Sequence, residues 1–190
     1  MVHGPSYNRI VAFSARALHQ MPVTPLEIYL DRLHEIHATR RGTPELSYRA
    51  ALENLLNAVG QRLDPTIQAT AELADAGAGH PDFGLLEVKS GNLRGVVEVK
   101  GVAEDTPDTA DGAQVTRYWQ RYGYVLVTNY RDFLLIVKHD DGKARVEGRY
   151  QLAANAEAFW RSRPHALANL HAEGLTDFLL GALTRAAPIT

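Results

Sequence analysis

Two short stretches, Pro81-Asp82 and Glu98-Val99-Lys100, decide the interpretation of this sequence, and fifteen residues separate them. Asp82–Val88 and Gly95–Lys100 have the composition of strands, and the Ser90-Gly91-Asn92 sequence between them is typical of a hairpin turn. In an antiparallel hairpin that turns there, Asp82 falls opposite the region of Glu98 to Lys100, and directly paired residues lie about 5 Å apart. We therefore expect two carboxylates and one lysine to meet on neighbouring strands.

These residue types in this arrangement predict metal-assisted hydrolysis. Glu98 and Lys100 are two positions apart in one strand, so they share a face, whereas Val97 and Val99 point the other way, towards a core. Two carboxylates can hold a divalent ion near a phosphodiester, and an adjacent lysine can orient the attacking water. Magnesium prefers oxygen ligands and retains several waters, so two carboxylates and a backbone carbonyl suffice as the protein's share.

A second Glu-Val-Lys tripeptide, Glu87-Val88-Lys89, lies nearer to Asp82 in the sequence. Asp82 and Glu87 are five positions apart in one predicted strand, which separates them by about 16 Å. The odd offset also places them on opposite faces. We therefore assign the metal centre to Glu98 and Lys100 and interpret Lys89 as a surface charge near the turn.

The rest of the chain predicts a mixed α/β domain with a central sheet flanked by helices. Thr24-Pro25-Leu26-Glu27 combines a capping box with a proline in the first turn, which indicates a helix start. The further elements that we expect are a helix from Thr43-Pro44 to Gly60, a strand over Thr66–Leu73, a loop over Gly101–Asp111, a helix over Ala113–Tyr122, a strand over Tyr124–Thr128, a hairpin of Phe133–Lys138 and Ala144–Tyr150, and helices over Ala156–Arg161 and Ala166–Thr184.

The composition limits the classes of protein that the chain can represent. Its 190 residues, 45% of them hydrophobic, suit one globular domain with flanking elements. The absence of cysteine excludes disulfides and thiolate-bound metals, and it fits a cytoplasmic location. No apolar run approaches the roughly 20 residues that span a bilayer, so we expect no membrane association. The net charge of −2 argues only mildly against nucleic-acid binding, because a metal changes the local effect of its carboxylate ligands.

The order helix, three strands, helix, strand, with Pro-Asp on the second strand and Glu-x-Lys on the third, resembles the PD-(D/E)XK nuclease superfamily. The resemblance implies a restriction-endonuclease-like core. Glu53 matches the acidic residue that many members carry in the preceding helix to complete the metal site. Gln114 and Tyr118 match the Gln-x-x-x-Tyr motif of the RecB-like branch, and their spacing places them on one helical face.

Four segments are similar to the N-terminal nuclease domain of large single-chain restriction–modification enzymes, of type ISP or type IIG, which also carry an N6-adenine methyltransferase. They are Gly77–Gly84, Gly95–Gly101, Gln114–Tyr118 and Val127–Phe133. The chain contains neither a phosphate-binding loop for a helicase motor nor an amino-methylation motif. Methylation, target recognition and any translocation would therefore lie in other domains or subunits. We divide the chain into an arm (1–22), a nuclease domain (23–150) and a C-terminal helical extension (151–190).

By this resemblance, Asp82, Glu98 and the carbonyl of Val99 would bind magnesium, which manganese can replace, and Glu53 would help directly or through water. Lys100 would position the attacking water, and duplex DNA would be the substrate. One alternative is a nuclease-like DNA-binding or docking module that no longer cuts, although retention of both carboxylates and the lysine argues against it. Another is a structure-specific or repair-type nuclease that is unlinked to restriction and uses the same chemistry. An exposed position would equally explain Glu53, and helix-to-sheet packing would explain Gln114 and Tyr118.

Two groups of aromatic and histidine side chains have simpler interpretations. His34 and His37 lie three apart on the first predicted helix, but no further ligand is apparent for a zinc ion, so we interpret them as ordinary residues of the helix surface. Tyr118, Trp119 and Tyr122 could stack on bases, yet aromatic residues beside a sheet more often belong to the core.

Overall fold

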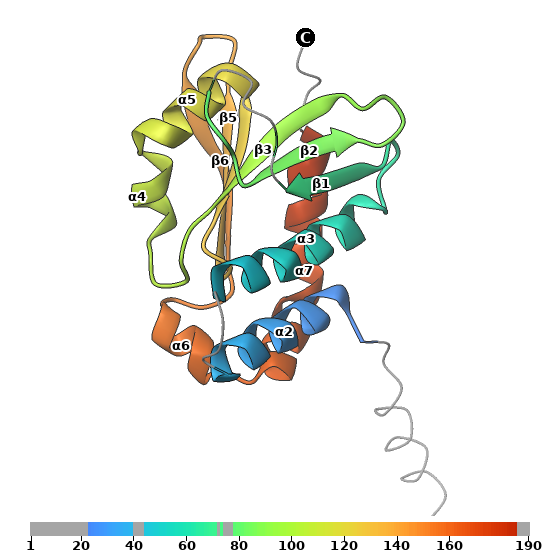
Figure 1. Ribbon diagram of the computed structural model, residues 1–190, viewed down its shortest axis with the longest axis vertical. Helices are drawn as coiled ribbons and strands as arrows, with labels where there is room; N and C mark the ends of the chain where they lie inside the picture. Colours follow the sequence, from blue (N-terminus) through green and yellow to red (C-terminus); the bar gives the residue numbers. More distant parts are fainter. Residues whose placement is uncertain (1–22, 40–43, 72, 74–77, 186–190) are drawn as a thin grey trace, which may run out of the picture.

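The computed structural model describes residues 23–39, 44–71, 73 and 78–185 (Figure 1). The predicted N-terminal arm, residues 1–22, lies outside the described residues. The elements follow in the order α2 (Pro25–Thr39), α3 (Pro44–Gly60), β1 (Ile67–Ala71), β2 (Phe83–Glu87), β3 (Leu93–Val99), α4 (Thr106–Ala110), α5 (Ala113–Tyr122), β4 (Tyr124–Thr128), β5 (Asp132–Lys138), β6 (Ala144–Gln151), α6 (Ala156–Arg161) and α7 (Pro164–Arg185).

Local sequence signals set several of these boundaries. The backbone N–H of Glu27 donates to Thr24 Oγ1 over 3.2 Å, so Thr24 caps α2 as its capping box predicts. At the end of α5, Gly123 adopts the left-handed conformation with φ 73°, and its N–H donates to the carbonyl of Trp119. Glycine reaches this conformation without a steric penalty, which explains why the helix ends there. Both predicted boundaries are confirmed.

The described strands form one mixed sheet in the order β1-β2-β3-β4-β5-β6. Neighbouring strands are antiparallel except β3 and β4, which are parallel with Glu98 opposite Val127. A parallel connection needs a crossover, and α4 and α5 occupy it. The predicted α-β-β-β-α-β order with a following hairpin and helices is therefore confirmed.

The two faces of the sheet bury separate sets of apolar side chains. One face carries Val97, Val99 and Leu126 and packs against α2, α3, α6 and α7. The other face carries Val96, Val125 and Val127 and packs against Tyr118 and Tyr122 of α5. Since Tyr118 is fully buried and Tyr122 nearly so, their predicted core role is confirmed. Adjacent residues of β3 alternate between the two cores, so Glu98 lies on the α5 face.

One expectation from the sequence was wrong, and one pair of surface residues has a contact that was not predicted. The predicted loop Gly101–Asp111 contains the short helix α4, because Asp105 stands at its N-cap position and Pro107 lies in its first turn. His37 is exposed on the surface of α2 as expected, His34 is half-buried, and the rings of both contact Trp160 of α6. The His37 ring stacks on the indole with 3.8 Å between ring centroids. The pKa of His34 is lowered, mainly by burial and to a smaller extent by the neighbouring His37.

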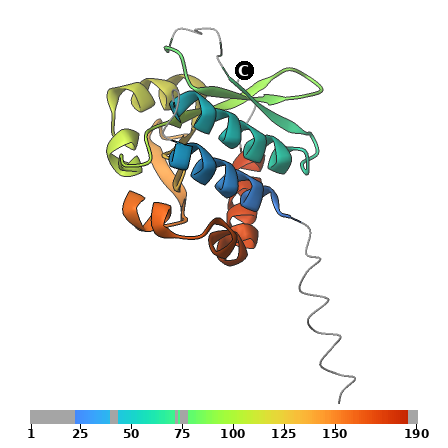
Figure 2. The same ribbon diagram turned by 60° about the horizontal axis from the view of Figure 1, so that its bottom comes forward.

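The C-terminal helices pack into the same core as the first two helices. α7 contacts α2, α3 and β6, and α2 and α3 run side by side (Figure 2). The hydroxyl of Tyr124 in β4 donates to the carbonyl of Ala182 in α7 over 2.8 Å. The predicted separation of residues 151–190 from the nuclease domain stays a prediction. Within the described ranges, every helix is too short or too polar to cross a membrane.

Candidate active site

The hairpin of β2 and β3 brings Asp82 and Glu98 together. Phe83 pairs with Val97 in this antiparallel ladder, so Asp82, one residue earlier, lies opposite Glu98, one residue later. The backbone N–H of Val99 donates to Asp82 Oδ2 over 2.7 Å, which ties the Asp82 side chain to β3. The juxtaposition that the hairpin spacing predicts is therefore present.

Each of the four carboxylate oxygens of this pair accepts from a protein donor. Asp82 Oδ2 accepts from the Val99 amide, and Asp82 Oδ1 lies 2.7 Å from Arg49 Nη2. Glu98 Oε1 lies 2.8 Å from Lys100 Nζ, and Glu98 Oε2 accepts from Gln114 Nε2 over 3.3 Å. Two of these donors are cations and two are neutral amides. The negative charge that the two carboxylates concentrate is thus balanced by one arginine and one lysine.

Burial and charge change the proton affinity of this cluster. The Glu98 side chain is only 2% exposed, and this burial raises the pKa of its carboxyl, with a further contribution from the negative charge of Asp82. The hydrogen bond from Lys100 acts in the opposite direction. For Lys100, the hydrogen bond to Glu98 is the largest cause and raises the pKa of the ammonium group. Lys100 is therefore a stable cationic donor whose side chain remains about one-third exposed.

Gln114 and Tyr118 lie behind Glu98 on α5, as their four-residue spacing predicts. Gln114 Nε2 donates to the hydroxyl of Tyr118 over 2.8 Å as well as to Glu98. The Tyr118 ring is buried in the core of the α5 face, and this burial raises the pKa of its hydroxyl. Tyr118 thereby anchors the amide that orients Glu98.

The sequence interpretation missed Arg49, which reaches Asp82 from α3. Glu53 lies one helical turn further along α3 and is half-buried. No three Asp, Glu or His side chains of the described residues form a group that could hold a metal ion, so the structure brings Asp82 and Glu98 together without Glu53. A contribution of Glu53, directly or through water, stays a prediction. The spacing of Arg49 and Glu53, four residues apart on a helix, was the signal that could have pointed to Arg49.

The second Glu-Val-Lys tripeptide lies at the other end of the hairpin. Glu87 pairs with Arg94, and both side chains are largely buried. Lys89 is 79% exposed and lies 3.8 Å from Asp64, which is itself almost fully exposed. Both pairs lie near the turn, whereas Glu98 lies opposite Asp82 and pairs with Lys100.

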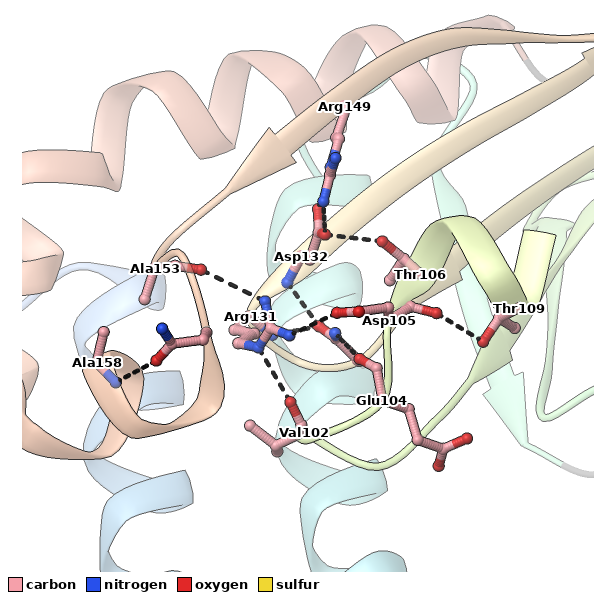
Figure 3. A network of polar contacts seen from close by, with 12 residues as sticks. Val102, Glu104, Asp105, Thr106, Thr109, Arg131, Asp132, Arg149, Ala153 and Ala158 are labelled. Carbon is pink, nitrogen blue, oxygen red and sulfur yellow. Dashed lines mark hydrogen bonds and ion pairs between the residues drawn. The ribbon is translucent and has the colours of Figure 1, made fainter. Parts of the chain in front are cut away.

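A buried polar network fixes the segment that follows Lys100 (Figure 3). The backbone N–H of Lys100 donates to the carbonyl of Thr128 at the end of β4. In the next turn of the chain, Arg131 is 2% exposed and its Nε donates to the carbonyl of Val102 over 3.0 Å, while Nη2 lies 3.4 Å from Asp105. Asp132 accepts from Thr106 Oγ1 over 2.7 Å and pairs with Arg149. The turn after β4 therefore holds the start of α4 beside the site.

A cleft of about 560 Å³ opens at Glu98, Lys100 and Gln114. Its other walls come from Ala103–Asp105, α4 and the first residues of α5. A larger groove of about 740 Å³ lies between α2 and α3, but its walls contain no acidic residue or histidine among the described residues. The smaller cleft thus gives a ligand access to Glu98 and Lys100, the two residues of the candidate site that line it together with Gln114.

The described chain has a restriction-endonuclease-like α/β fold, and this class rests on two solved structures with which it shares its architecture. The cryo-EM structure of the DrdV–DNA complex matches with a TM-score of 0.54 and 20% identity, over 82% of this chain and 13% of the DrdV chain. The crystal structure of the type IIG restriction endonuclease BpuSI matches with a TM-score of 0.53 and 15% identity, over 75% of this chain and 17% of BpuSI. This chain therefore corresponds to a small part of each enzyme. Neither a family model nor a curated protein sequence matches it.

Proposed function

We propose that this chain is the DNA-cleaving domain of a restriction–modification enzyme, a magnesium-dependent endodeoxyribonuclease. The observation that carries the proposal is the meeting of Asp82, Glu98 and Lys100 at the start of β2 and the end of β3 in a restriction-endonuclease-like fold. The two structural neighbours support it, since one is described in complex with DNA and the other as a restriction endonuclease. Methylation and target recognition, and a helicase if one is present, would belong to other domains or subunits.

The donor set at the site fits a hard divalent cation. Asp82 and Glu98 offer carboxylate oxygens from the β2–β3 hairpin, and the carbonyl of Val99, next to Glu98 in the sequence, would be a further oxygen ligand. Magnesium, when bound, would polarise the phosphodiester and neutralise charge that develops on it. The Lys100 ammonium would hold the attacking water in line with the scissile bond, and Gln114 would orient Glu98. Cleavage would leave a 5′-phosphate and a 3′-hydroxyl.

The proposal is tested by plasmid cleavage in magnesium or manganese, with wild type, Asp82→Asn and Lys100→Met. The two variants are expected to cut at least about 100-fold more slowly, because each removes a group that acts on the reacting atoms. Lys89→Met is the matched control, since it makes the same substitution in the second Glu-Val-Lys tripeptide, on an exposed side chain outside the site. It is expected to cut like wild type.

The pattern of results separates this function from that of a silent DNA-binding or docking module. If wild type is inert but binds magnesium in calorimetry, and Asp82→Asn loses this binding, the centre is intact and requires its partner domains. A well-folded wild type with neither cleavage nor metal binding would contradict the nuclease proposal and favour the silent module.

A further inference from the structure

Arg49 forms an ion pair with a carboxylate oxygen of Asp82 that the proposed metal would need as a ligand. Its Nη2 lies 2.7 Å from Asp82 Oδ1, while the Val99 amide holds Oδ2. A neutral amide can keep its hydrogen bond to a carboxylate that also binds a metal, because it brings no net charge. A guanidinium at the same oxygen repels a divalent cation and competes with it for the lone pair.

We propose that Arg49 is a latch that holds Asp82 in the DNA-free protein and moves to a DNA phosphate when substrate binds. The move frees Oδ1 of Asp82 for the metal, so DNA and metal binding assist each other. This inference rests on the proposed nuclease function and adds a regulated step to it. It assigns to Arg49 a role in positioning that neither the motif nor the fold supplies.

The environment of Arg49 fits an exchange between two anions. Its side chain is 30% exposed and that of Asp82 only 12%, so the arginine is the partner that can turn towards solvent. The planar guanidinium group can donate two parallel hydrogen bonds to either a carboxylate or a phosphate, so a DNA phosphate is a suitable second partner. Arg49 comes from α3, whereas both carboxylates lie on the hairpin, so its movement requires no change in the sheet. Lys100, the other cation of the site, forms its ion pair with Glu98.

The latch has a measurable consequence for metal affinity in the absence of DNA. An equilibrium that favours the closed form weakens the apparent affinity by the fraction of open protein. If the closed form makes up about nine-tenths of the protein, removing the arginine tightens metal binding about tenfold. Structural damage at the site would have the opposite effect, because it would weaken the binding.

Calorimetric titration with manganese of the full 190-residue chain tests the latch. Arg49→Met is compared with wild type and with Arg32→Met, which removes the same charge from an exposed position on α2 that pairs with Glu35. Arg49→Lys, which keeps the charge but loses the planar fork, is the second variant in case Arg49→Met folds poorly. We expect tighter manganese binding in Arg49→Met, intermediate binding in Arg49→Lys and unchanged binding in Arg32→Met.

A second titration measures the coupling with DNA. Two proteins are compared, Lys100→Met and the double variant Lys100→Met/Arg49→Met, because both are expected to have lost cleavage. A short DNA duplex should increase the manganese affinity of Lys100→Met more than that of the double variant. Equal or weaker manganese binding in a folded Arg49→Met, or an unchanged coupling, would overturn the latch while leaving the nuclease centre in place. Retention of manganese binding in Asp82→Asn would overturn both proposals, since the metal would then bind elsewhere.

Discussion

At the scale of single residues, the candidate site is a balance of charges in which neutral and cationic donors have different roles. Asp82 and Glu98 are held by two neutral amides, those of Val99 and Gln114, and by two cations. The neutral donors orient the carboxylates without opposing the proposed metal, whereas the cations would compete with it or substitute for its charge. This distinction predicts that the loss of Gln114 weakens manganese binding and that the loss of Arg49 strengthens it.

Gln114→Leu is expected to weaken manganese binding about tenfold or more, because groups that orient metal ligands commonly contribute factors of this size. The substitution removes the donor to Glu98 Oε2 and leaves the Tyr118 hydroxyl without its amide partner. Calorimetric titration with manganese measures the change. Gln120→Leu, on the exposed side of the same helix, is the matched control. Equal affinities for the two variants would show that Gln114 only packs α5 against the sheet.

At the scale of elements, the hairpin and the turn after β4 could be anticipated to different degrees. The register of β2 and β3 follows from a turn signal and an alternating pattern, both of which are local, so the meeting of Asp82 and Glu98 was predictable. The contact of Arg49 with Asp82 joins α3 to the residue just before β2, and the four-residue spacing of Arg49 and Glu53 points to it only indirectly. The network around Arg131 was likewise not predicted, because a buried arginine is stable only with partners that the fold brings from several segments.

Arg131→Met tests whether this network holds the segment after Lys100. The side chain is almost fully buried, and its loss leaves the carbonyls of Val102 and Ala153 without their donor. We expect the free energy of unfolding to fall by about 3 kcal/mol, as for other broken buried polar networks. Equilibrium unfolding in urea measures this change in the free energy of unfolding. Arg145→Met, which breaks a half-exposed pair with Asp141, should change it by less than about 0.5 kcal/mol. Similar values for both would mean that water replaces Arg131 in the network.

At the scale of the whole molecule, the question is whether the C-terminal helices fold together with the sheet. The buried leucines of α7 share one apolar core with α2, α3 and the strands, and the core on the α5 face lies across the sheet from them. The two cores share the same strands, so unfolding of the core on one face of the sheet also destabilises the core on the other face. We therefore expect the described chain to unfold as a single cooperative unit.

The two tryptophans of the chain report on the two faces separately, since Trp119 packs with the α5 core and Trp160 with the opposite one. Leu179→Ala in α7, where the side chain is fully buried, should lower the free energy of unfolding by about 2–5 kcal/mol. In Trp119→Phe and Trp160→Phe backgrounds, the fluorescence midpoint in urea should shift equally for both reporters. Leu170→Ala, at a leucine of α7 that is 75% exposed, should shift neither. A shift seen by Trp160 alone would show that residues 151–190 unfold as a separate unit. Equal shifts would make α7 part of the scaffold that holds β2 and β3, and thus Asp82 and Glu98, in register.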